Sequence, residues 1–139
     1  DQKLIYEAYF AYAMMWSIGG AVADSRDVNY AKQFSTWMKS VCKAKLPDKH
    51  ADGSDASCFE FRYDAVCHEW VPWSNEVKAY SNLGTQMFQN IVVSNAEIEA
   101  RKAIIKLHMQ QNKPVLFVGV AGTAKTTIVR DFISELVLQ

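Results

Sequence analysis

The chain has 139 residues, of which 50% are hydrophobic, and its 15 basic side chains balance 15 acidic ones, so the formal net charge is zero. A chain without net charge has no broad electrostatic field to attract nucleic acid or an anionic membrane surface. No apolar run approaches the ~20 residues that a membrane-spanning helix needs. We therefore expect neither nucleic acid nor a membrane among its partners.

The cysteines favour a reducing compartment. Cys42, Cys58 and Cys67 include no C-x-x-C pair and follow no secretory signal, which favours reduced thiols in the cytosol. Cys67 and His68 are adjacent, but neighbouring residues on a strand point to opposite faces and no second pair lies at zinc-finger spacing. A zinc site is therefore the weaker interpretation of this pair.

Two helices are predicted at the start of the chain. Residues 4–18 are strongly apolar and end at Gly19 and Gly20, so we expect a helix that is buried around most of its circumference. Asp24 and Ser25 are the predicted caps of a second helix that reaches about residue 43. Its apolar residues recur at i, i+3 and i+4 spacing, and the two helices would form an α-hairpin. These residues are Val28, Ala31, Phe34, Trp37, Met38 and Val41.

The middle of the chain predicts a loop and a β-hairpin. Residues 46–57 contain Pro, Gly, Ser and three Asp, and they predict an exposed, mobile loop. Residues 58–64 alternate apolar and polar side chains, the period of a half-buried strand, and residues 67–71 are the expected partner. The sequence Trp-Val-Pro-Trp-Ser at 70–74 is too aromatic for a solvent loop, and its proline disfavours a central strand. We expect an extended segment packed at an interface, with a ligand cage as the alternative.

A helix and a strand are predicted ahead of the most informative motif. Ser94 followed by Glu97 is a capping-box pattern, and apolar residues cover a broad face from there to about residue 111. Pro114 ends this helix. The continuous apolar run at residues 115–118 is typical of a strand buried on both faces of a parallel sheet.

Residues 119–126 match the Walker A pattern G-x-x-x-x-G-K-[ST] at Gly119, Lys125 and Thr126, although Ala124 stands where the pattern has its second glycine. The predicted strand before this loop and a predicted helix over 126–138 supply the structural context that the pattern requires. A tight loop of small residues aims backbone N–H groups at a polyphosphate, and the helix N-terminus adds the positive end of its dipole. The sequence therefore predicts a nucleotide-binding loop.

Each side chain of the loop has an expected role. The Lys125 ammonium would lie between the β- and γ-phosphates, the Thr126 hydroxyl would coordinate Mg²⁺, and Thr127 would flank the α-phosphate. Ala124 adds a methyl group, so the loop either holds helical φ/ψ there or shifts outward. The alternative is a strand-loop-helix turn that merely contains these residue types. The residues predicted to bind ATP or ADP are Gly119, Val120, Ala121, Gly122, Thr123, Ala124, Lys125, Thr126 and Thr127.

Hydrolysis requires groups beyond this loop. A Walker B acid, a water-positioning residue and a trans-acting arginine normally follow the Walker A helix in sequence. Asp131 and Glu135 are expected on the exposed side of that helix, so we assign no catalytic residue within the chain. Because the chain starts without Met and stops soon after the motif, we expect a fragment that neither hydrolyses ATP alone nor folds alone.

The order of these features resembles the junction between the second and third AAA+ modules of a dynein heavy chain, with axonemal members more similar than cytoplasmic ones. The most specific pieces are W-S-I-G-G at the end of the first helix, V-P-W-S, and V-G-x-A-G-T-x-K-T. The resemblance implies an α/β fold in two parts. Residues 1–80 would be the helical small subdomain and hairpin of one module, and residues 81–139 the first helix, strand, P-loop and helix of the next large subdomain.

The resemblance also implies a function. The third module's nucleotide would regulate an ATP-driven microtubule motor, and the family's glycine at the position of Ala124 argues against full ATP turnover here. The implied partners are the rest of the ring, microtubules, and dynein intermediate and light chains, in the cytoplasm and the ciliary or flagellar axoneme. The alternatives are a non-hydrolysing structural ring segment, another giant AAA+ ring ATPase, or a small nucleotide kinase. A kinase is disfavoured because over 110 residues precede the loop, whereas a kinase would have it near its N-terminus. By family placement, the residues beside the adenine would be Ile91, Val92 and Val93.

Overall fold

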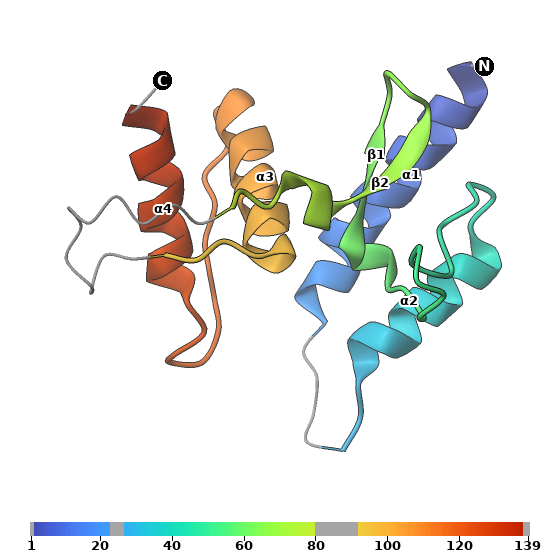
Figure 1. Ribbon diagram of the computed structural model, residues 1–139, viewed down its shortest axis with the longest axis horizontal. Coiled ribbons are helices and arrows are strands. Elements are labelled where there is room, and N and C mark those ends of the chain that lie inside the picture. Colours follow the sequence, from blue (N-terminus) through green and yellow to red (C-terminus); the bar gives the residue numbers. More distant parts are fainter. Residues whose placement is uncertain (1, 23–26, 80–91, 138–139) are drawn as a thin grey trace. The chain divides into compact units, whose positions relative to one another are not determined.

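The computed structural model describes residues 2–22, 27–79 and 92–137 (Figure 1). The chain divides into two compact units, which we call unit 1 (Asp1–Pro72) and unit 2 (Trp73–Gln139). The described part of unit 1 contains two α-helices, short 3₁₀ turns and an antiparallel hairpin, whereas the described part of unit 2 is helical with long connections. The mixture of helices and strands agrees with the predicted α/β class. None of the helices within the described ranges is both long and apolar enough to cross a membrane.

The first predicted helix is confirmed as α1 (Gln2–Ser17), which is followed by the 3₁₀ turn η1 (Gly19–Ala21). Only one face of α1 is buried, contrary to the prediction, because it packs on the rest of unit 1 along a single stripe. The opposite face carries aromatic side chains such as Tyr6 and Phe10, which are 72% and 68% exposed. The buried stripe consists of Ala8, Ala11 and Met15.

Gly19 allows η1 to approach α2 closely. A Cβ at Gly19 would lie 2.7 Å from the ring of Phe59 and would overlap the ring of Phe34, whereas a Cβ at Gly20 would lie 3.5 Å from the ring of Trp16. The first glycine is therefore required by packing. The second tolerates a side chain.

Helix α2 (Tyr30–Val41) starts later than predicted. Its N-cap is Asn29, whose side-chain oxygen accepts a hydrogen bond of 2.6 Å from the Lys32 amide, while Asp24 and Ser25 lie outside the described residues. The predicted apolar stripe is buried only in part, since Trp37 remains 50% exposed. Ser35 is buried instead, and its hydroxyl accepts a hydrogen bond of 2.9 Å from the amide of Cys58.

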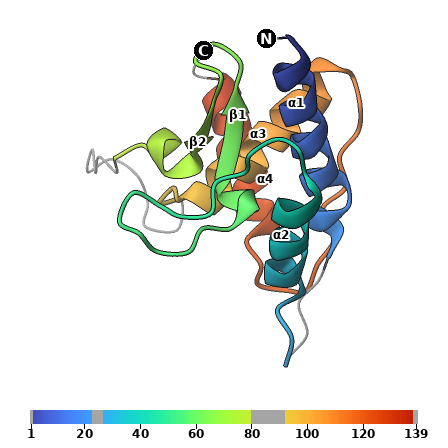
Figure 2. The same cartoon turned by 90° about the vertical axis from the view of Figure 1, so that its right-hand side faces the viewer.

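Residues 42–57 lead from α2 toward the hairpin as a long loop (Figure 2), and residues 51–55 are exposed, as predicted. The mobility of this loop stays a prediction. Lys49 and Asp55 form an isolated antiparallel bridge, and Leu46 and Ala56 are buried. The Lys39 ammonium donates a hydrogen bond of 2.5 Å to the Ala56 carbonyl. Two buried apolar side chains therefore attach this mostly polar segment to the rest of unit 1.

The predicted hairpin is confirmed as β1 (Phe61–Asp64) and β2 (Glu69–Pro72), which are antiparallel with Phe61 opposite Pro72. The strand begins later than predicted because Cys58–Glu60 form the 3₁₀ turn η2. Pro72 is the last residue of β2, so it interrupts no further pairing. The hairpin contacts α1, and the core of unit 1 contains Ala8, Ala11, Met15, Met38, Ala44, Leu46 and Cys58.

Unit 2 begins with the 3₁₀ turn η3 (Trp73–Glu76), which contacts α3 (Ala96–Gln110). The predicted extended segment therefore ends at Pro72, and Trp73 is buried at 4% exposure. Helix α3 is capped by Asn95, whose side chain accepts from the Ile98 amide at 2.9 Å, rather than by the predicted Ser94.

Helix α4 (Lys125–Val137) lies beside α3 and confirms the helix predicted after the loop (Figure 1). A small apolar cluster joins the two helices through Ile105, Ile128 and Phe132. The buried strand predicted at residues 115–118 is wrong. Leu116 and Val118 are 85% and 84% exposed, because no strand in the described part of the chain lies alongside to form a ladder with them.

Candidate functional site

The loop at residues 119–124 joins the extended segment to α4 and has the backbone of a tight turn. Gly122 has φ of 82°, a conformation that disfavours any side chain. A Cβ at Gly119 would lie 3.4 Å from the Thr123 hydroxyl and 3.8 Å from the Lys125 ammonium. Gly122 is thus required by the backbone conformation of the turn, whereas Gly119 lies beside the Thr123 and Lys125 side chains.

The Lys125 side chain folds back over this turn. Its ammonium donates to the carbonyls of Gly119 at 3.0 Å and Val120 at 2.5 Å, and to the Thr123 hydroxyl at 2.9 Å. The Thr123 hydroxyl in turn donates to the Val120 carbonyl at 2.9 Å. The loop therefore holds a cation at its centre, and a polyphosphate oxygen is a stronger partner for that cation than a neutral carbonyl.

Ala124 adopts the left-handed conformation, with φ of 55°. The expectation of helical φ/ψ is therefore wrong, because the residue keeps the backbone conformation that glycine favours. The alternative, an outward shift of the loop, stays a prediction. An alanine there costs about 1–2 kcal/mol relative to the right-handed region. Its carbonyl accepts the first hydrogen bond of α4, from the Ile128 amide at 2.9 Å, so the strained residue also starts the helix.

For the other residues predicted to bind nucleotide or Mg²⁺, the structure gives only their exposure. Thr126 and Thr127 are exposed in the first turn of α4. Val92 is half-buried, Val93 is 61% exposed, and Ile91 lies outside the described residues, so the adenine contacts of all three stay a prediction. Within the described ranges no group of three or more His, Cys, Asp or Glu could hold a metal ion. The Mg²⁺ contact expected of the Thr126 hydroxyl stays a prediction.

Sequence reasoning missed a buried charge cluster between α3 and α4. The Lys102 side chain is 5% exposed, and its ammonium lies 2.9 Å from a Glu99 oxygen and 3.0 Å from oxygens of both Asp131 and Glu135. The prediction that the two α4 acids lie on the exposed side is therefore wrong, because they face Lys102. The sequence did contain one signal for this arrangement. The i, i+4 spacing of these two acids places them on one face of a helix.

The charges in this cluster reinforce one another. Burial disfavours the charged form of Lys102, but hydrogen bonds to Glu99, Asp131 and Glu135 outweigh it and raise the pKa of the lysine. Partial burial opposes ionisation of Glu135, yet hydrogen bonds from Lys102 and Lys78 lower the pKa of that carboxyl. Lys102 and Glu135 are both charged at neutral pH as a result.

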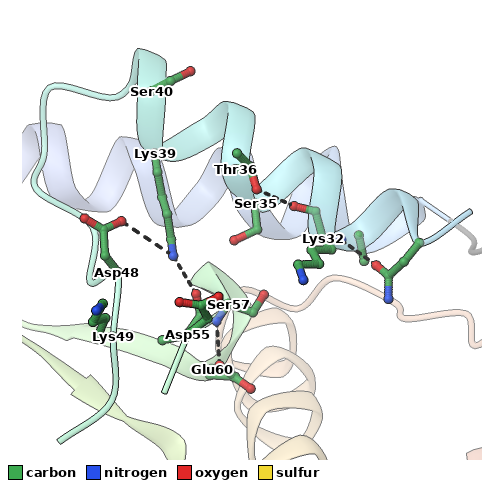
Figure 3. Close-up of a pocket in the computed structure, with 13 residues that line it drawn as sticks. Lys32, Ser35, Thr36, Lys39, Ser40, Asp48, Lys49, Asp55, Ser57 and Glu60 are labelled. Atoms are coloured by element: carbon green, nitrogen blue, oxygen red, sulfur yellow. Dashed lines mark hydrogen bonds and ion pairs between the residues drawn. The ribbon is translucent and has the colours of Figure 1, made fainter. Parts of the chain in front are cut away.

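A hollow lies in unit 1, between α2 and residues 48–60 (Figure 3). It has a volume of about 720 Å³ and contains lysines and carboxylates together. Lys39 points between the Ala56 carbonyl and Asp48, whose carboxylate lies 3.7 Å from the ammonium. Glu60 accepts a hydrogen bond of 2.6 Å from the Ser57 amide. Because lysines and carboxylates line it together, the hollow favours neither an anion nor a cation by its charge.

Comparison with known proteins matches both units. The sequence model of the dynein heavy chain AAA lid domain matches residues 1–75, and that of the P-loop containing dynein motor region matches residues 80–138. Similar proteins include dynein axonemal heavy chain 11 of Sus scrofa at 27% identity, the ciliary dynein beta chain of Heliocidaris crassispina at 29%, and dynein axonemal heavy chain 17 of Mus musculus at 30%. Each alignment covers 96% of this chain, which spans about 3% of the length of these relatives. The chain belongs to the dynein heavy-chain family.

Proposed function

We propose that this chain is a segment of the AAA+ ring of an axonemal dynein heavy chain, and that residues 119–127 form the Walker A site of a regulatory module, the third in the ring. The observation that carries the proposal is the Lys125 ammonium, held over a glycine-containing turn at the start of α4. The ligand would be ATP or ADP with Mg²⁺. The assignment to the junction of the second and third modules rests on the resemblance in sequence.

Binding would exchange internal contacts for phosphate contacts. Lys125 would release the carbonyls of Gly119 and Val120 and donate to β- and γ-phosphate oxygens, while the loop amides and the N-terminal end of α4 bind the rest of the polyphosphate. Mg²⁺, held through Thr126, would neutralise charge on the phosphates. Val92, Val93 and Ile91 would contact the adenine.

Hydrolysis would depend on other parts of the heavy chain. Asp131 and Glu135 are engaged by Lys102, so neither is available as a Walker B acid or a general base. The strained Ala124 argues for slow turnover rather than rapid cycling. A site that binds nucleotide and turns it over slowly suits regulation, because loss of the γ-phosphate shifts the packing of subdomains around a ring.

The cellular setting follows from the relatives. Their names place them in cilia, flagella and axonemes. We propose the same setting here, with microtubules and dynein intermediate and light chains reached through other parts of the heavy chain.

A structural ring segment is the second candidate. The loop already satisfies the Lys125 ammonium with its own carbonyls and the Thr123 hydroxyl, and an alanine occupies the position of the conformationally free glycine. Such a loop could support the ring while holding nucleotide permanently or not at all.

A nucleotide-binding experiment on the heavy chain that contains this segment tests the proposal. Lys125→Ala should remove one equivalent of bound fluorescent ATP analogue, whereas Lys106→Ala, which alters an exposed lysine on α3, should remove none. Equal occupancy in the two variants would refute nucleotide binding at this loop. Lost occupancy with unchanged microtubule gliding speed would favour the structural candidate over the regulatory one.

A further inference from the structure

We propose that Lys102 is a positioning residue for the nucleotide loop, because it fixes α4, and with it Lys125 and Thr126, against α3 and the segment at residues 92–95. The inference rests on the proposed binding of nucleotide at residues 119–127. The buried charge cluster around Lys102 is not itself proposed to contact the nucleotide.

The contacts of Lys102 define how α4 lies on α3. The lysine comes from the middle of α3 and is 4% exposed, and its ammonium bonds to Asp131 and Glu135 on α4. These acids are one helical turn apart on the same face. A rotation of α4 about its axis, or a slide along it, would break both bonds together.

The apolar contact beside the cluster cannot define this arrangement alone. Ile105 packs with Ile128 and Phe132, and hydrophobic contact is not directional, so it tolerates small rotations. Charge-assisted hydrogen bonds are short and directional. Lys102 therefore sets the register that the apolar cluster leaves open.

The cluster reaches both ends of the proposed nucleotide site. On one side, Asp131 lies within about two helical turns of Lys125, which starts α4. On the other, Glu99 bonds to Lys102 at 2.9 Å and also accepts a hydrogen bond from the hydroxyl of Ser94, the neighbour of Val93. One connected network thus joins the segment proposed to contact adenine with the helix proposed to contact phosphate.

Stability alone is a poor explanation for such a cluster. Replacing a buried ion cluster by apolar residues of similar volume is often neutral or stabilising, because desolvation offsets the attraction between the charges. A cluster of this kind is better suited to selecting one arrangement of two helices. For this protein, the selected arrangement is the one that presents Lys125 at the loop.

The test measures ATP-analogue affinity in the heavy chain that contains this segment. Lys102→Met should weaken binding at this site about tenfold, the size expected for a coupling residue, while the exposed control Lys106→Met should leave it unchanged. In a Lys125→Ala background, Lys102→Met should have no further effect on the titration. That result would tie the loss to this site and not to another nucleotide site of the ring.

A second variant separates positioning from folding. Lys102→Met combined with Glu99→Gln, Asp131→Asn and Glu135→Gln removes the unpaired buried charges, so unit 2 should regain its protection from hydrogen exchange. The positioning role predicts that affinity stays about tenfold weaker despite this recovery. Affinity that returns with protection would overturn the inference. If Lys125→Ala reduces binding and Lys102→Met does not, the positioning role fails and the proposed function stands. If Lys125→Ala has no effect on binding, both the positioning role and the proposed function fail.

Discussion

The two units bury their surfaces in different ways. Unit 1 closes a core with side chains from both helices, the connection and η2, and aromatic rings pack around it, as in the pairs Trp16–Phe59 and Phe34–Phe59. The described part of unit 2 joins two helices by a small apolar cluster and by Lys102 with its acids. Non-directional packing suits a supporting element, whereas directional ion contacts suit an element that must present a loop in one orientation.

The largest expected effect follows from removing the positive charge of Lys102 in unit 2. Lys102→Met leaves three carboxylates facing one another and should lower the free energy of local opening by about 3 kcal/mol, the low end for breaking a buried ion pair, because the acids on α4 keep partial exposure. Hydrogen exchange of peptides from α3 and α4 in the heavy chain measures this loss. A change below about 0.5 kcal/mol would mean that apolar packing alone holds unit 2.

The corresponding test of unit 1 is steric. Gly19→Ala places a methyl group against Phe34 and Phe59 and should cost about 2 kcal/mol, as overpacking usually does. Gly20→Ala is the matched control, because its methyl group would make only an ordinary contact with Trp16. Exchange in α1 and α2 peptides should rise in the first variant and not in the second. Equal effects would contradict the close approach of η1 to α2.

A smaller effect is expected in the nucleotide loop, and its sign depends on position. Ala124→Gly should stabilise the start of α4 by about 1 kcal/mol, because glycine removes the cost of a left-handed alanine but loses more chain entropy on folding. Gly122→Ala should destabilise the loop, since that residue also has positive φ. Protection of the Ile128 amide, which bonds to the residue 124 carbonyl, measures both changes. Shifts of the same sign would show that the strain is not where the structure places it.

The smallest expected effect is a dependence on pH in unit 2. Hydrogen bonds from Lys102 and Lys78 lower the folded pKa of Glu135 despite its partial burial, so its contribution is present above the unfolded pKa of about 4.5 and is lost as pH falls through the folded value. The contribution should be less than about 1 kcal/mol, since the side chain is 34% exposed. Glu135→Gln should flatten the decline in α4 protection below pH 4.5. An unchanged decline would assign it to other acids.

Local patterns predicted much of this fold, and contacts between distant residues account for what they missed. The helices, the hairpin and the turn before α4 each depend on spacing within a short window. The acids at 131 and 135 were misplaced because their partner, Lys102, is 29 residues from the nearer one. The run at 115–118 has the composition of a buried strand, but composition cannot supply the neighbouring strand that would bury it.

The capping residues show a finer limit. At α3 the predicted cap was Ser94, but the adjacent Asn95 accepts the amide hydrogen bond while Ser94 bonds to Glu99. At α2 the cap is Asn29, downstream of the predicted Asp24 and Ser25. Several residues with suitable side chains lie near each helix start, and tertiary packing selects among them. For the candidate site, sequence predicted the loop residues, whereas the left-handed Ala124 and the network behind the loop became visible only in the structure.

The proposed function depends on whether the loop closed by Lys125 binds a nucleotide polyphosphate. A cryo-electron microscopy map of the heavy chain with Mg²⁺ and a slowly hydrolysed ATP analogue tests it most directly. If the loop binds nucleotide, phosphate density will lie at residues 119–127, and the Lys125 ammonium will contact the phosphates in place of the Gly119 and Val120 carbonyls. A map in which Lys125 keeps those carbonyl contacts and no density fills the turn would contradict it.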